Sequence, residues 1–116
     1  SKMMVKKYST KSLSEIAGGD KDFMLIIAKN FLEKIPPDLK EMQVVIGNNN
    51  RKLAYQFAHK MKLNLEIFGL NLGKKITSIE SWTKNLKNKS TIETHLKNVV
   101  ATLESTFIEL KRDFKL

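Results

Sequence analysis

Apolar residues recur every three or four positions through most of this chain, and this spacing constrains its fold more than any other feature. No segment alternates apolar and polar residues for long enough to predict a strand. Short polar breaks separate the periodic segments, so consecutive helices should run antiparallel. The sequence therefore predicts an all-α, up-down antiparallel four-helix bundle with a short helical lead-in. The expected helices cover about residues 20–47, 50–69, 72–86 and 91–116.

The first 19 residues are mostly polar and predict that lead-in, with residues 1–12 loosely ordered. Within it, Leu13 and Ile16 predict a short helical turn that docks on the bundle. Ser12 or Ser14 is the expected N-cap of this turn, and the glycine pair that follows is the expected stop. The whole chain of 116 residues is the size of a single domain.

The first long helix has an expected N-cap at Asp20 and an expected stop at Gly47. Pro36 and Pro37 lie in its middle, where a proline removes a hydrogen bond and clashes with the preceding turn. The helix either breaks there and restarts with Pro37 in its first turn, or continues with a kink, and we count it as one helix. The asparagines at 48–50 supply a turn and the next N-cap. The apolar stripe comprises Phe23, Ile26, Ile27, Phe31, Leu32, Ile35, Leu39, Met42, Val45 and Ile46.

Composition limits the compartment and the chemistry. The chain has no cysteine, which excludes disulfides and thiol nucleophiles and fits a reducing compartment. Its longest apolar run, residues 23–28, is far shorter than the roughly 20 residues of a membrane-spanning helix. No signal-peptide pattern is present. We therefore expect a cytoplasmic domain that does not insert into a membrane, and a monomer is our working expectation, although the sequence leaves the oligomeric state open.

The net charge of +9 comes almost entirely from lysine, since only two of the 21 basic residues are arginine. Residues 51–97 alone carry a balance of +7. Such a surface attracts an acidic partner or a phosphate, although a solvated, lysine-rich surface explains the charge equally well. Nucleic-acid readers generally use more arginine, because the guanidinium forks onto phosphates and base edges. A nucleic-acid partner is therefore not expected.

His59 is the candidate for chemistry. On a helix turning by about 100° per residue it points almost directly away from the apolar face, and Lys62 follows one turn later. Neutral imidazole, with a reference pKa near 6.5, is a nucleophile at neutral pH. A phosphoryl group on its nitrogen is dianionic and favours a nearby cation. An exposed histidine near a lysine is nevertheless common in lysine-rich helices. The apolar face comprises Leu53, Ala54, Phe57, Met61, Asn64, Leu65, Phe68 and Leu72.

The second histidine, His95, is followed by Asn98 where His59 has Lys62. We interpret His95 as an ordinary surface or boundary residue. Two histidines without cysteine, and without a carboxylate at ligand spacing, predict no metal site. The sequence also lacks a Ser-His-Asp arrangement and a glycine-rich phosphate loop.

The pentapeptide from Ala58 to Lys62 reads Ala-His-Lys-Met-Lys, and Gly69 follows ten residues after the histidine. This pattern resembles the signature of histidine phosphotransfer (HPt) domains of two-component phosphorelays, which runs Ala-His-x-Leu-Lys-Gly and continues to an apolar residue and a glycine. The resemblance covers about residues 13–110. An upstream pattern of an aromatic residue, proline and two spaced apolar residues is matched by Phe31, Pro36, Pro37, Leu39 and Met42.

The resemblance implies that His59 accepts a phosphoryl group from an aspartate of a receiver domain and passes it to another receiver. The receiver belongs to a response regulator or a hybrid histidine kinase and brings its own Mg²⁺, so this chain needs no cofactor. Lys62 would stabilise the phosphate. The chain would be a stoichiometric carrier without autonomous kinase activity.

Two positions depart from the family pattern. Leu63 stands where the family prefers glycine, so it either crowds the approach of a receiver or adds an apolar contact, and we favour the second. Family members often carry Gln or Glu on the following helix, bonded to the histidine, and an ungapped count puts Ser81 at that position. Tyr55, Leu63 and Glu66 flank the imidazole as candidate docking residues. The alternative function is a degenerate, non-phosphorylated bundle that only docks receivers or other proteins.

Overall fold

In the computed structural model, which describes residues 7–82 and 88–116, every regular element is a helix. The all-α prediction is therefore confirmed for these ranges. The four expected long segments correspond to α2–α5, but α4 has only nine residues, and α1 is the short helix expected in the lead-in. The elements are α1 (Thr10–Ile16), α2 (Lys21–Gly47), α3 (Arg51–Ile67), α4 (Gly73–Ser81) and α5 (Lys89–Phe114).

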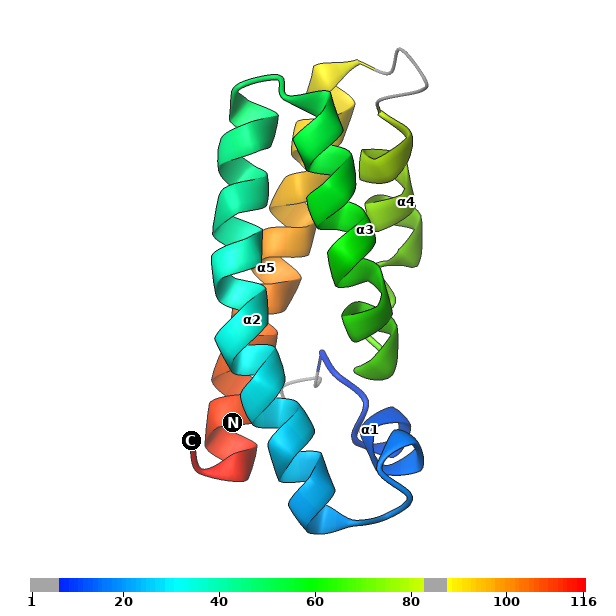
Figure 1. The fold of residues 1–116 in the computed structure, drawn as a ribbon, viewed down its shortest axis with the longest axis vertical. Helices are drawn as coiled ribbons and strands as arrows, with labels where there is room; N and C mark the ends of the chain where they lie inside the picture. The colour runs from blue at the N-terminus through cyan, green and yellow to red at the C-terminus, as the bar shows by residue number, and fades with distance from the viewer. Residues whose placement is uncertain (1–6, 83–87) are drawn as a thin grey trace, which may run out of the picture.

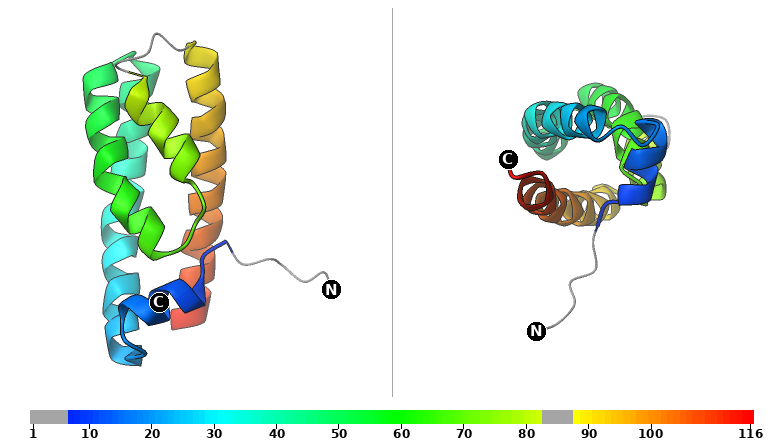
Figure 2. Two further views of the ribbon diagram at one scale, coloured as in Figure 1. Left: turned by 90° about the vertical axis from the view of Figure 1, so that its right-hand side faces the viewer. Right: turned by 90° about the horizontal axis from the view of Figure 1, so that it is seen from below.

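The four helices after α1 form a ring in which each packs against two others (Figure 1). α3 lies between α2 and α4, and α5 completes the ring between α4 and α2. From α2 onward, successive helices run in opposite directions (Figure 1). α1 lies at one end, near the turn between α3 and α4, and contacts α2 and α3 (Figure 2). This arrangement leaves one side of α3 facing outward.

Side-chain caps fix where several helices begin. Asp20 accepts from the backbone N–H of the third residue after it, and Asn50 does the same for α3, so both predicted caps are confirmed. The cap of α1 is Ser9, so the prediction of Ser12 or Ser14 is wrong. Asn88 caps α5, which therefore begins two residues before the expected start at Thr91.

Helix α2 continues through Pro36 and Pro37 as one element. Each proline costs about 3 kcal/mol inside a helix. Eight side chains of α2 are buried, including Ile35 and Leu39 on either side of the prolines. At roughly 1.5–3 kcal/mol for each large apolar side chain, their burial outweighs the proline cost. Packing on both sides of the prolines thus favours one helix over two.

Most of the expected apolar stripe of α2 is in the core, but its first turn is not. Phe23 and Ile26 are exposed, and Met24 and Ala28 are buried in their place. The prediction is wrong for Phe23 and Ile26 because the first turns of α2 face the core with Met24 and Ala28 instead. On α3, Ala58 joins the buried face, while Leu53 is exposed, so the prediction that it lies on the apolar face is wrong.

The lead-in is held to the helices from residue 7 onward. The buried Tyr8 donates a hydrogen bond from its hydroxyl to Asp113 at 2.6 Å, and its ring meets Phe68 edge-on at 6.3 Å. The Ser9 N–H donates to the Phe68 carbonyl at 2.7 Å. These contacts hold residues 8 and 9 against α3 and α5, and residues 1–6 lie outside the described part. Leu13 docks as predicted, whereas Ile16 is exposed.

Trp82 follows the last residue of α4 and is fully buried. The Arg51 guanidinium lies 5.0 Å from the centre of its indole ring. The predicted continuation of this helix from residue 83 to residue 86 lies outside the described residues. Among the described helices, none combines the length and the apolar character that a bilayer-spanning helix requires.

Candidate functional site

His59 lies on the outward side of α3, and 66% of its side chain is exposed. Ala58 and Met61, its neighbours on the opposite side of the helix, are buried. The Tyr55 ring stacks on the imidazole with an interplanar angle of 8° and a centroid distance of 5.6 Å. The outward orientation expected from the helical spacing is therefore what the structure has, and Leu63 does not cover the ring.

One nitrogen of the imidazole is held by a carboxylate from α4. His59 Nδ1 lies 2.9 Å from Glu80 Oε2. A carboxylate oxygen accepts hydrogen bonds, so we assign the imidazole proton to Nδ1. In the neutral ring this leaves the lone pair on Nε2, at the other edge of the ring. Within residues 7–82 and 88–116, no side chain bonds that nitrogen.

The other oxygen of the same carboxylate accepts a hydrogen bond from Lys62. Its Nζ donates to Glu80 Oε1 at 3.1 Å, so the carboxylate joins His59 and Lys62. Only 11% of the Glu80 side chain is exposed. Burial raises the pKa of the Glu80 carboxyl, but the hydrogen bonds from His59 and Lys62, with the charge of Lys62, outweigh it and hold this pKa below its usual range. Glu80 is therefore ionised at neutral pH.

The residue opposite the imidazole is Glu80 and not Ser81. The Ser81 hydroxyl donates to the Ser78 carbonyl within its own helix, at 3.2 Å. The prediction of Ser81 was wrong by one residue. It came from counting positions along the chain, which ignores how the α3–α4 turn sets the rotation of α4. The signal for Glu80 was present in the sequence, as a carboxylate directly beside the counted position.

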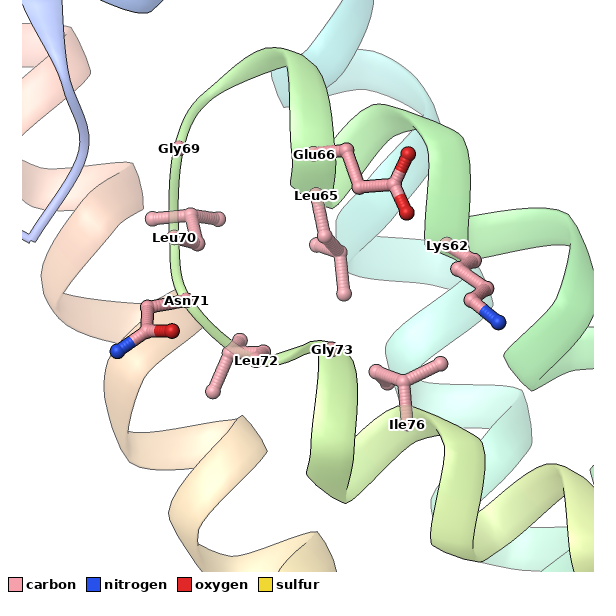
Figure 3. Close-up of a pocket in the computed structure, with 9 residues that line it drawn as sticks. All are labelled: Lys62, Leu65, Glu66, Gly69, Leu70, Asn71, Leu72, Gly73 and Ile76. Atoms are coloured by element: carbon pink, nitrogen blue, oxygen red, sulfur yellow. The ribbon is translucent and has the colours of Figure 1, made fainter.

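The remaining candidate residues follow α3 toward α1. Leu63 is one turn beyond His59, and 66% of the residue is exposed. Glu66 is exposed one turn further on and borders a pocket of about 330 Å³ between the end of α3 and the start of α4 (Figure 3). The close-up shows Lys62 at the side of this pocket that lies along α3. His59 and Glu80 are not among its lining residues.

Other charged groups near the site have their own partners or lie elsewhere. Lys60, next to His59, donates to Asp38 of α2 at 3.3 Å. His95 is partly buried on α5, a helix that does not pack against α3. In the ranges that the structure covers, no group of three His, Cys, Asp or Glu side chains is arranged to hold a metal ion.

Comparison with known proteins identified no relative: no protein-family model, no curated protein and no solved structure matches this chain.

Proposed function

We propose that this chain is a phosphorelay intermediate that carries a phosphoryl group on His59. The observation that carries the proposal is an exposed imidazole whose Nδ1 is fixed by a buried carboxylate, which leaves Nε2 open to a partner. The resemblance of the surrounding motif to HPt domains supports the same chemistry. With this proposal we describe α2–α5 as the up-down four-helix bundle of that family, in a monomeric, cytoplasmic domain.

In the proposed reaction the donor is an aspartyl phosphate of a receiver domain. Nε2 of His59 attacks the phosphorus, and the N–P bond forms as the bond from phosphorus to the aspartyl oxygen breaks. The electron pair of that bond leaves with the aspartate as its carboxylate. The Nδ1 proton stays in place, and its hydrogen bond to Glu80 stabilises the positive charge that develops on the ring. Attack by an aspartate of a second receiver reverses these steps.

Lys62 fits a supporting role in this reaction. An ammonium group has three donors, so Lys62 can keep its bond to Glu80 and also donate to a phosphoryl oxygen. The chain would act as a stoichiometric carrier without kinase activity. The Mg²⁺ that activates the receiver's aspartate would come with the receiver, and the carrier itself would need no cofactor.

Docking of a receiver would use the outward side of α3. Tyr55 stacks on the imidazole, and Leu63 and Glu66 continue the same side toward α1. The exposed Leu63 also favours a second candidate function. A chain that departs from the family's glycine at this position can bind receivers, or other proteins, without taking up phosphate. Leu63 thus serves either function, and only a transfer assay separates them.

That assay incubates the chain with receiver domains charged by radiolabelled acetyl phosphate. We expect label that is lost in acid and stable in alkali, as for phosphohistidine. His59→Gln should abolish labelling, and His95→Gln is the matched control that should keep it. Label retained in His59→Gln but lost in His95→Gln would make the assignment wrong. Receiver binding without any label would favour the docking-only function.

A further inference from the structure

The two basic groups of the site share one carboxylate. Glu80 Oε2 accepts a hydrogen bond from His59 Nδ1 at 2.9 Å, and Glu80 Oε1 accepts one from Lys62 Nζ at 3.1 Å. We propose that Lys62 is a positioning residue that offsets the charge of Glu80 and so keeps the His59 imidazole neutral, with its Nε2 lone pair available. The geometry of the three groups supports this by itself, and only the consequence for phosphoryl transfer rests on the proposed function.

The physical reason lies in what a carboxylate alone would do to the ring. An opposite charge within about 4–6 Å shifts a titration by roughly one to three pH units toward the charged form. An imidazolium has protons on both nitrogens and therefore no lone pair for attack. A buried carboxylate held only by His59 would favour that cation. Lys62 bonds the other oxygen and supplies a counter-charge to the carboxylate. The carboxylate therefore stabilises a doubly protonated ring less than it would alone.

Any charged group near His59 on the helices that pack against α3 would also affect the charge of the imidazole. α3 packs against α1, α2 and α4. α4 contributes Glu80 to the imidazole, and α2 contributes Asp38, which pairs with Lys60 at 3.3 Å. α1 brings Glu15 near Leu63, further along α3. Among the described residues, Glu80 is the one carboxylate within hydrogen-bonding distance of His59.

The test is an NMR titration of the His59 ring in the full chain, without phosphate. Lys62→Met should move the midpoint upward by about one pH unit. A midpoint one unit higher lowers the neutral fraction of the ring at a given pH by at most about tenfold. The rate of phosphoryl uptake at neutral pH should fall by at least the same factor as the neutral fraction, because Lys62→Met also removes the donor proposed for a phosphoryl oxygen. Lys60→Met removes the same charge from the adjacent position and should move the midpoint much less, because Lys60 pairs with Asp38.

A second background separates an effect through Glu80 from a direct effect of the lysine charge. In Glu80→Gln the amide still accepts from Nδ1–H but carries no charge for Lys62 to offset. Adding Lys62→Met to that variant should therefore change the midpoint no more than Lys60→Met does. An equal shift in both backgrounds, or no shift for Lys62→Met alone, overturns the proposal. The titration needs no receiver, so its result stands even if no receiver labels the chain.

Discussion

Glu80 and His59 are 21 positions apart and lie on different helices, yet the carboxylate of one meets the imidazole of the other at 2.9 Å. His59 and Lys62 share a side of α3 through their spacing alone. Glu80 reaches both from α4, and it sets which imidazole nitrogen carries the proton. The site therefore depends on the packing of α4 against α3 and not on α3 alone.

Leu63→Ala tests the apolar contact at the docking surface. We expect about fivefold weaker binding to a receiver, because truncating an apolar side chain at an interface costs on the order of 1 kcal/mol. Stability should change by less than about 0.5 kcal/mol, since Leu63 is mostly exposed and alanine favours helix. Calorimetry with the receiver measures the first quantity and urea unfolding the second.

Ile108→Ala is the control for Leu63→Ala. Ile108 is equally exposed but lies on α5, which does not pack against α3. Its truncation should leave receiver binding unchanged. If Leu63→Ala instead speeds phosphoryl uptake and tightens binding, the leucine crowds the approach of the receiver, and the apolar-contact interpretation is wrong.

Glu80→Gln should change how stability depends on pH in acid. The pKa of the Glu80 carboxyl is lowered in the folded chain, against an unfolded value of about 4.3. The contribution of Glu80 to folding stability is therefore fully present above the unfolded pKa. It is lost as the pH falls through the lower folded pKa. The stability difference between the natural chain and Glu80→Gln should shrink as the pH falls from about 4.3 through the lower folded value, as measured by urea midpoints. A difference that stays constant over this range would contradict the expectation.

Tyr8→Phe should change how folding stability depends on pH in alkali. Burial raises the pKa of the Tyr8 phenol, and the hydrogen bond to Asp113 and the charge of that carboxylate add to it. The contribution of Tyr8 is fully present below the unfolded value of about 10 and is lost as the pH rises from there toward the folded value. At neutral pH the variant should lose about 1 kcal/mol with the hydrogen bond. Above about pH 10 its stability should fall less steeply than that of the natural chain, and parallel urea-midpoint curves would refute this.

Gly69→Ala tests how the lead-in is attached. Gly69 has φ +60°, and an added Cβ would lie 2.8 Å from Ser9 Cβ and 2.9 Å from Ser12 Oγ. The left-handed backbone alone costs a side chain about 1 kcal/mol, and the contact with Ser9 adds to that. We expect a loss of at least about 1 kcal/mol in urea unfolding. Gly47→Ala is the control, because the added Cβ meets nothing within 4 Å and Gly47, the last residue of α2, has no left-handed backbone.

If the loss in Gly69→Ala comes from the contact as well as from the backbone, Ser9→Gly should recover part of it. Ser9→Gly also removes the cap of α1, so it must be measured alone as well. The double variant should then be more stable than the sum of the two single changes. Strict additivity would mean that the close approach of Ser9 to Gly69 contributes nothing.

The sequence by itself determined the helices and the outward position of His59. Both follow from side chains within one helix, where a fixed turn per residue relates each position to the next. The caps at Asp20 and Asn50 are equally local, since each bonds a backbone group three residues away. The continuity of α2 through its prolines was left open by the sequence, because the burial that favours it depends on other helices.

Only the tertiary structure decided which residue of α4 faces the imidazole. A shift of one position rotates a helix by about 100°, so Ser81 and Glu80 point in different directions, and the α3–α4 turn selects Glu80. The burial of Tyr8 likewise depends on the tertiary structure. Its partners lie on α5 and at the end of α3, far from it along the chain, and no local spacing relates them.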